Sequence, residues 1–136
     1  MSTSDPPNPR FVVLRHVGFG PDHFDLMFES PAGVLVTYRA DSWPPTVERL
    51  CTLDRIGDHR VDYLAYEGPV SGGRGTVRRV ESGDYCTLLG SVDGATGDQF
   101  QVRLRGTGGC YTCEAKKVPN AAGRWHIRPI TEIGGA

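Results

Sequence analysis

The chain has 136 residues, of which 18 are glycine and 10 are proline. Together they make up about a fifth of the residues, against a usual ~12%, and they interrupt the chain too often for a helical bundle or a coiled coil. The apolar runs are only a few residues long, so we expect no membrane span and no membrane partner. No secretory signal is recognisable, and the expected location is the cytoplasm.

The formal net charge is −1, but the charges are unevenly distributed. Residues 99–136 carry six basic and two acidic side chains, and 13 of the 15 basic residues are arginine. The planar guanidinium of arginine suits phosphate recognition. A GC-rich genome would raise the arginine content as well, so composition leaves both explanations open. A net charge near zero therefore does not exclude a nucleic-acid ligand.

The first half of the chain predicts a disordered lead followed by strands. Residues 1–9 are polar and are expected to be disordered, and Phe11–Leu14 is a short apolar strand. Residues 23–29 alternate apolar and polar side chains, and after the turn at Pro31–Gly33 a second strand at 34–39 completes a predicted hairpin. The pattern over residues 46–56 is less decided and allows a helical turn.

The second half predicts further short strands at residues 76–80, 85–89, 99–105, 110–118 and 124–130, with a frayed tail at 131–136. About eight strands, little helix and no internal repeat indicate a mainly all-β protein with one domain over residues 10–130. A small antiparallel β-barrel is the expected architecture, because closure removes exposed strand edges. The sequence does not reveal an oligomeric state.

A histidine and an aspartate share one face of the strand at 23–29. His23 and Asp25 are two residues apart, so they project from the face opposite Phe24 and Leu26. With His16 they form a set of two histidines and one carboxylate, which suits Mn²⁺, Fe²⁺ or Zn²⁺ and leaves coordination positions open. The alternative is a pair of ordinary solvated side chains on the outside of a strand.

A second polar cluster follows at residues 58–68. His59 and Tyr63 lie four residues apart, and both side chains can donate a hydrogen bond to a phosphate oxygen, while a histidine can also carry a proton. The alternative is that Tyr63 and Tyr66 pack in the core.

Together these segments resemble the 3′-phosphoesterase domain of bacterial ligase D proteins. The similarity runs from about Arg10 to Ile130, and its most specific parts are the His-x-Asp strand and the second polar cluster. The matching motifs are Phe11-Val12-Val13-x-x-His16, His23-Phe24-Asp25-Leu26-x-Phe28-Glu29, Gly33-Val34-Leu35 and Asp58-His59-x-x-Asp62-Tyr63-x-x-Tyr66-Glu67-Gly68.

The resemblance implies a metal-dependent hydrolase that heals nucleic-acid 3′ ends during end joining in DNA break repair. Members of that family are small β-barrels with a divalent metal, typically Mn²⁺, and they remove a terminal ribonucleoside and then the 3′-phosphate. By this resemblance His16, His23 and Asp25 are metal ligands, and His23, His59 and Tyr63 are catalytic. DNA or RNA–DNA 3′ ends are the implied partners, together with separate ligase or polymerase repair proteins.

The chain departs from the family pattern at two places. Seven steps rather than six separate His16 from His23, and the loop between them lacks the paired basic residues of the family. Met27 stands where the family has a phosphate-binding arginine. Four arginines could replace it, and with His59 and Tyr63 they form the predicted phosphate-binding set: Arg15, Arg39, Arg60 and Arg74. A catalytically weakened or inactive end-binding module is therefore the alternative function, and a barrel serving as a scaffold for protein contacts is a third.

Overall fold

The computed structural model describes residues 8–131 and confirms the mainly all-β prediction. Strands make up 57% of the described residues, and no α-helix is present among them. Residues 1–7 and 132–136, which hold most of the predicted lead and tail, lie outside it. The elements are β1 (Arg10–Val17), β2 (His23–Glu29), β3 (Val34–Ala40), β4 (Cys51–Arg60), the 3₁₀ helix η1 (Val61–Leu64), β5 (Gly68–Pro69), β6 (Thr76–Leu89), β7 (Gln99–Gly106), β8 (Gly109–Lys117) and β9 (Arg124–Pro129).

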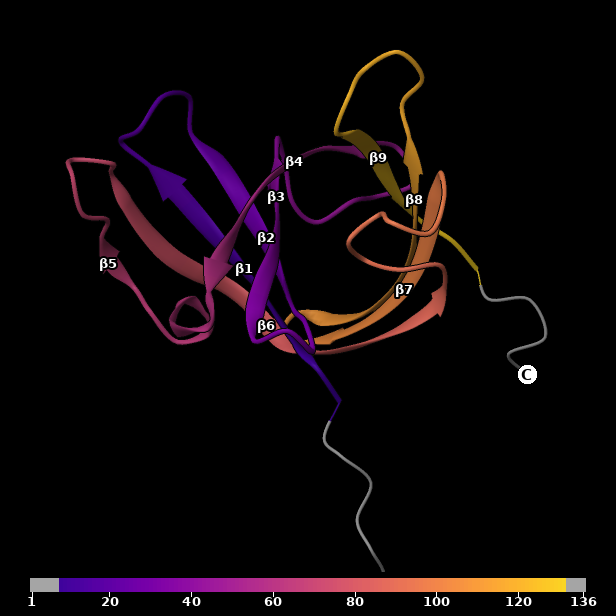
Figure 1. Ribbon diagram of the computed structural model, residues 1–136, viewed down its shortest axis with the longest axis horizontal. Helices are drawn as coiled ribbons and strands as arrows, with labels where there is room; N and C mark the ends of the chain where they lie inside the picture. Colours follow the sequence, from indigo (N-terminus) through magenta and orange to yellow (C-terminus); the bar gives the residue numbers. More distant parts are fainter. Residues whose placement is uncertain (1–7, 132–136) are drawn as a thin grey trace, which may run out of the picture.

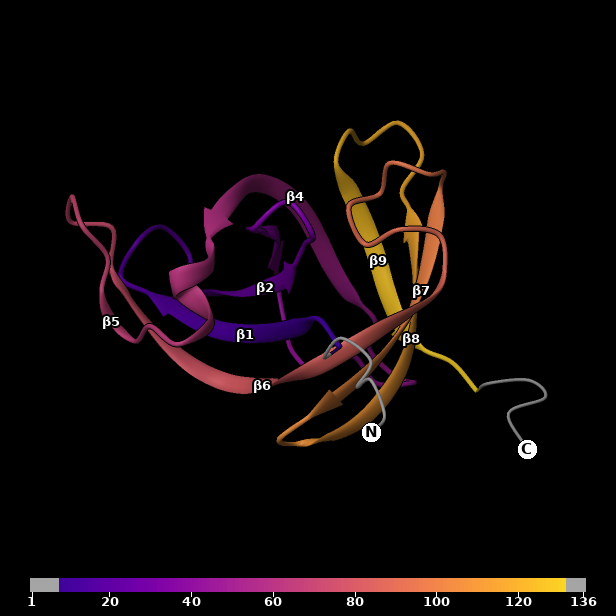
Figure 2. The ribbon, with the colours of Figure 1, turned by 60° about the horizontal axis from the view of Figure 1, so that its bottom comes forward.

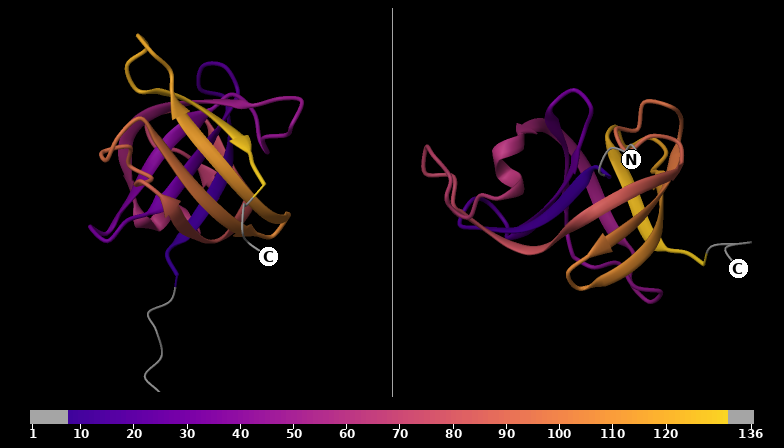
Figure 3. Two further views of the ribbon diagram at one scale, coloured as in Figure 1. Left: turned by 90° about the vertical axis from the view of Figure 1, so that its right-hand side faces the viewer. Right: turned by 90° about the horizontal axis from the view of Figure 1, so that it is seen from below.

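Eight of these strands close into an antiparallel barrel. The hydrogen-bonded order is β1-β2-β3-β4-β9-β8-β7-β6, and β6 pairs back onto β1 to complete the ring. Strand β5 lies outside the ring and pairs only with β6 (Figure 1). The strands cross the barrel obliquely in the left view of Figure 3. Among residues 8–131, no helix is long and apolar enough to span a membrane.

Two local expectations were wrong. The segment at 46–56 contains no helical turn, and its second half begins β4, because Cys51 and Leu53 are fully buried in the core while β4 pairs with both β3 and β9. The strands predicted at 76–80 and 85–89 form one continuous strand, β6. The polar residues between them pair with β1 on one side and β7 on the other, so tertiary pairing continues the strand through the predicted gap.

The barrel interior is filled by side chains. Aromatic residues such as Phe28, Tyr38 and Phe100 pack there, and the Tyr38 hydroxyl donates a 2.6 Å hydrogen bond to the carbonyl of Val92. Burial raises the pKa of Tyr38, which therefore stays a neutral donor. A filled interior leaves the outer surface of the barrel as the place for a site.

A second apolar cluster lies on the outer face of β1, β2 and β3. It consists of buried side chains from these strands and from β6, and Tyr63, Leu64 and Val70 pack against it. Helix η1 contacts both β1 and β3, and it lies over this side of the barrel in Figure 2. The face of β2 that alternation predicted to be polar is therefore covered rather than solvated. The buried members of this outer apolar cluster are Val12, Leu14, Met27, Leu35 and Val77.

Candidate metal and phosphate site

Three candidate ligands meet on the covered outer face of the β1–β2 hairpin. His16 is directly opposite His23 in the strand register, and Asp25 follows on the same face of β2. His23 and Asp25 are buried, with 5% and 3% of their surfaces exposed. One ligand atom from each residue lies within 4.8 Å of the others, and residues 8–131 contain no other such group of three.

The hydrogen bonding of His23 fixes which ring nitrogen is free. Nδ1 lies 2.9 Å from the carbonyl oxygen of Pro21, and a carbonyl only accepts, so Nδ1 carries the proton. In the neutral ring Nε2 then holds a lone pair, and it faces Oδ1 of Asp25 at 3.3 Å. Both atoms are buried, and neither has a hydrogen-bond partner in the described structure.

His16 repeats this arrangement with the opposite nitrogen. Its Nε2 donates to the carbonyl oxygen of Arg74 at 2.7 Å, so in the neutral ring the lone pair of Nδ1 faces Oδ2 of Asp25 at 3.0 Å. With both rings neutral, two imidazole lone pairs and one carboxylate converge with no proton between them. Such a buried set needs a positive charge, supplied by a proton or by a metal ion. Two nitrogens and a carboxylate oxygen, with each ring oriented by a backbone carbonyl, fit a divalent cation such as Mn²⁺.

Gly75 permits the contact that orients His16. It has a φ of +81°, and a Cβ built on it would lie 2.2 Å from the carbonyl oxygen of Val17. The loop before β6 thus approaches the end of β1 more closely than any side chain would allow. This approach places the Arg74 carbonyl against His16.

Replacing Gly75 with alanine is therefore expected to lower the affinity of the candidate site for Mn²⁺ by about 10- to 100-fold, because the Arg74 carbonyl that orients His16 is displaced. We also expect a loss of roughly 2–3 kcal/mol of unfolding free energy from the strained φ and the collision with β1. Calorimetric titration and chemical denaturation measure the two effects. Gly73→Ala is the matched control, since Gly73 has a φ of +69° in the same loop but open space around its Cβ position. Equal Mn²⁺ affinities for the two variants would contradict this role of Gly75.

A β-bulge brings His59 to the same face. Along β3 the register moves two residues from Thr37 to Leu35, while along β4 it moves three, from Ile56 to His59. The extra residue shifts the alternation, so that His59 and Ile56 both project outward. Nδ1 of His59 donates to the carbonyl oxygen of Gly57 at 2.9 Å, which leaves Nε2 free for a ligand. The ring packs edge-on against Tyr63 in η1, with 5.5 Å between the ring centroids.

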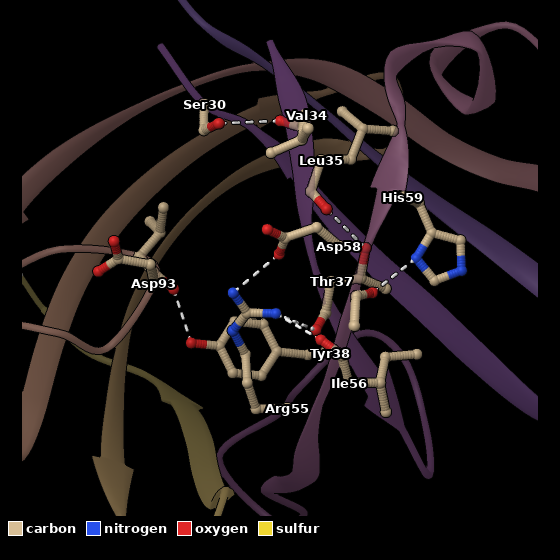
Figure 4. Close-up of polar contacts among 12 residues, drawn as sticks. Ser30, Val34, Leu35, Thr37, Tyr38, Arg55, Ile56, Asp58, His59 and Asp93 are labelled. Atoms are coloured by element: carbon tan, nitrogen blue, oxygen red, sulfur yellow. Dashed lines mark hydrogen bonds and ion pairs between the residues drawn. The ribbon is translucent and has the colours of Figure 1, made fainter. Parts of the chain in front are cut away.

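Arg55 holds this bulge from the other face of β4 (Figure 4). Its guanidinium donates to the carbonyl oxygens of Thr37 and Ile56 and to the carboxylate of Asp58, the last at 2.9 Å. It also lies 5.6 Å from the centre of the Tyr38 ring. The planar side chain of Arg55 thus links β4 at the bulge to the neighbouring strand β3.

Arg55→Lys is expected to cost about 1–3 kcal/mol of unfolding free energy, because a single ammonium cannot satisfy acceptors that a planar fork reaches together. Urea denaturation measures the loss. The control is Arg10→Lys at the exposed pair with Glu29, where we expect a change below about 0.5 kcal/mol. Equal losses in the two variants would show that Arg55 forms only an ordinary surface pair.

One cleft of about 540 Å³ contains most of the predicted site residues. Of the four predicted arginines, Arg39, Arg60 and Arg74 line it, and none of these three forms an ion pair with a described acidic residue. Arg15 is not part of the cleft: it projects from the other face of β1, 5.4 Å from the centre of the Phe24 ring and 3.6 Å from Asp22. The other predicted residues in the cleft are His16, His23, Asp25, His59 and Tyr63.

Arg39 is the best placed of the three arginines to bind an anion beside the candidate ligands. It lies directly opposite Asp25 in the β2–β3 register, where paired Cβ atoms are about 5 Å apart. Asp25 nevertheless directs its oxygens to the two histidines. On the β4 side, the strand neighbour of Arg39 is Asp54, whose carboxylate is held by Arg124 at 2.9 Å and 3.3 Å. Both acidic neighbours are thus engaged elsewhere, and the guanidinium of Arg39 remains available.

The guanidinium of Arg74 is engaged within its own loop, where it donates to the carbonyl and the hydroxyl of Ser71 at 2.8 Å and 3.2 Å. Its clearest contribution to the site is the backbone carbonyl that orients His16. Met27 is 1% exposed and belongs to the outer apolar cluster, so this position contributes no polar contact to the cleft.

Three contributors were not found from the sequence: Phe19, Arg55 and Gly75. Phe19 lines the cleft from the β1–β2 loop. An aromatic residue between two glycines was a visible signal for Phe19, whereas the roles of Arg55 and Gly75 depend on strand pairing and loop contacts distant in sequence.

No protein-family model matches the chain, and no curated protein matches it.

Proposed function

We propose that the protein is a divalent-metal-dependent 3′-phosphoesterase that acts on the 3′ ends of nucleic acid. The observation that carries the proposal is the largely buried set of His16, His23 and Asp25, whose lone pairs converge at the edge of an arginine-lined cleft. The sequence resemblance to the phosphoesterase domain of ligase D proteins supports the same activity. Mn²⁺ is the proposed cofactor, and the proposed substrates are DNA or RNA–DNA 3′ ends.

The side chains of the cleft can bind and orient a terminal phosphate. Arg39 offers a charged fork to two phosphate oxygens, and the Tyr63 hydroxyl is a further donor. His16, His23 and Asp25 would hold the cation, which would supply Lewis-acid polarisation of a phosphoryl oxygen.

Hydrolysis of a 3′-phosphate breaks the bond between phosphorus and O3′ and forms a bond between phosphorus and a water oxygen. O3′ must then gain a proton, and the attacking water must lose one. The Nε2 of His59 is free to hold the proton that the water loses, because its Nδ1 donates to the carbonyl of Gly57. The edge-on ring of Tyr63 restricts the imidazole to this orientation.

The test is hydrolysis of a primer–template with a 3′-phosphate by the purified protein in the presence of Mn²⁺. We expect release of inorganic phosphate that requires the metal, stops with a chelator and is absent with a 5′-phosphate end. His23→Ala and Asp25→Ala should each abolish it. Activity that survives both substitutions unchanged would exclude the proposed centre.

A second candidate is an end-binding module that has lost catalysis. Burial of Met27 favours it, because the position of the family arginine is occupied by an apolar side chain. This candidate predicts salt-sensitive binding of nucleic-acid ends with no turnover under any divalent metal. Turnover that depends on Mn²⁺ concentration excludes it, and calorimetric titration with Mn²⁺ distinguishes an intact metal site from a degraded one.

A further inference from the structure

Phe19 presents an aromatic ring to the cleft. It lies in the loop between β1 and β2, and 44% of its surface is exposed, although a phenyl ring gains free energy from burial. One side of the ring is next to the imidazole of His16, with 6.1 Å between the centroids and 21° between the planes. The ring therefore lies beside the candidate metal ligands and still has surface for a flat partner.

The loop that carries Phe19 is held in place. Gly18 and Gly20, on either side of it, have φ values of +83° and +66°, which give the backbone a turn that other residues rarely adopt. A Cβ built on Gly18 would lie 3.4 Å from the Cα of Gly75, so the loop rests against the segment that orients His16. Phe19 is thus presented from a backbone that packs on the site.

We propose that Phe19 stacks on the base of the terminal nucleotide, so that the site takes nucleotide 3′ ends in preference to base-free sugar phosphates. This inference rests on the proposed function and specifies its substrate class. Arginine and histidine side chains of the cleft recognise the phosphate, and every nucleobase offers a flat face to an aromatic ring whatever its sequence. The site therefore selects for the presence of a base and not for its identity.

Binding measurements without Mn²⁺ test the inference independently of catalysis. Two fluorescent oligonucleotides are compared, one with a normal 3′-terminal nucleotide 3′-phosphate and one with a tetrahydrofuran abasic residue 3′-phosphate at that position. From typical stacking energies we expect the wild-type protein to bind the base-bearing end about tenfold more tightly. In Phe19→Leu the two ends should bind equally, because leucine keeps an apolar cover over His16 but lacks the aromatic face. Fluorescence anisotropy at low salt gives the dissociation constants.

Leu50→Ala is the matched control, since Leu50 is also 44% exposed and lies outside the cleft. It should keep the full preference for the base-bearing end. Equal binding of the two ends by the wild-type protein, undetectable binding of both, or a preference that persists in Phe19→Leu overturns the inference. Mn²⁺-dependent hydrolysis, measured in parallel, reports separately on the proposed function. A Phe19-dependent preference for the base-bearing end without hydrolysis supports this inference and rejects the proposed catalysis. Hydrolysis without that preference supports the proposed catalysis and rejects this inference.

Discussion

Asp25→Asn is expected to abolish the stabilisation of the wild-type protein by Mn²⁺ that the proposed function predicts. At a free Mn²⁺ concentration of 100 times the dissociation constant, binding to the native state should raise the wild-type melting temperature by roughly 10 °C. The variant should show no such rise, because the central acceptor between His16 and His23 is lost. Hydrolysis of a 3′-phosphate end should fall by about 1,000-fold, in line with the loss of several kcal/mol of charge stabilisation.

The metal-free protein separates this effect from misfolding. An asparagine amide supplies an N–H donor where the carboxylate of Asp25 now meets a ring lone pair, so it can satisfy the buried Nε2 of His23. We therefore expect the melting temperature of metal-free Asp25→Asn to equal or exceed that of the metal-free wild type. Differential scanning calorimetry with and without Mn²⁺ provides all four values. A full Mn²⁺-dependent rise in the variant would mean that Asp25 is not a ligand.

Arg39→Ala should lower kcat/KM for a 3′-phosphate end by about 100- to 1,000-fold, the range typical for loss of one charge-stabilising donor in an active site. The reason is its position opposite Asp25, with both neighbouring carboxylates engaged by other groups. Arg39→Lys should recover only part of the loss, because an ammonium lacks the planar fork. Steady-state kinetics at fixed ionic strength measure both variants.

Arg15→Ala is the matched control for charge. Arg15 is next to His16 in the sequence, but it projects from the other face of β1 towards Phe24. We expect kcat/KM to change by less than about twofold, as for an exposed and poorly coupled charge. Equal losses in Arg15→Ala and Arg39→Ala would indicate general attraction of nucleic acid to a basic surface rather than a specific phosphate contact.

The sequence was most informative where strand periodicity alone determines geometry. Alternation over residues 23–29 placed His23 and Asp25 on one face, and the turn signal at Pro31–Gly33 predicted the hairpin that β2 and β3 form. The barrel followed from the number of short strands and from the need to protect their edges. These features depend on residues a few positions apart, which local patterns describe well.

Contacts between segments distant in sequence could not be predicted from these local patterns. The burial of the outer apolar cluster that includes Met27 depends on packing from η1 and from Val70, and no periodicity within β2 reports it. The direction of His59 depends on the bulge in β4, which Arg55 stabilises from the opposite face. Strict alternation would have placed His59 and Ile56 on opposite faces. Among the arginines, strand register rather than composition separates Arg39 from Arg15.

The hydrogen bond between His16 and the Arg74 carbonyl spans 58 positions of the chain and joins β1 to the loop that leads into β6. Closure of the barrel occurs along this same seam, where β1 pairs with β6. A chain whose seam has not formed still has the His23 and Asp25 pair on one hairpin, but the imidazole of His16 lacks the partner that directs its lone pair. The candidate cation site is therefore completed only when β1 and β6 are paired. Cation uptake would then distinguish closed barrels from incompletely folded chains and shift the folding equilibrium towards the closed form.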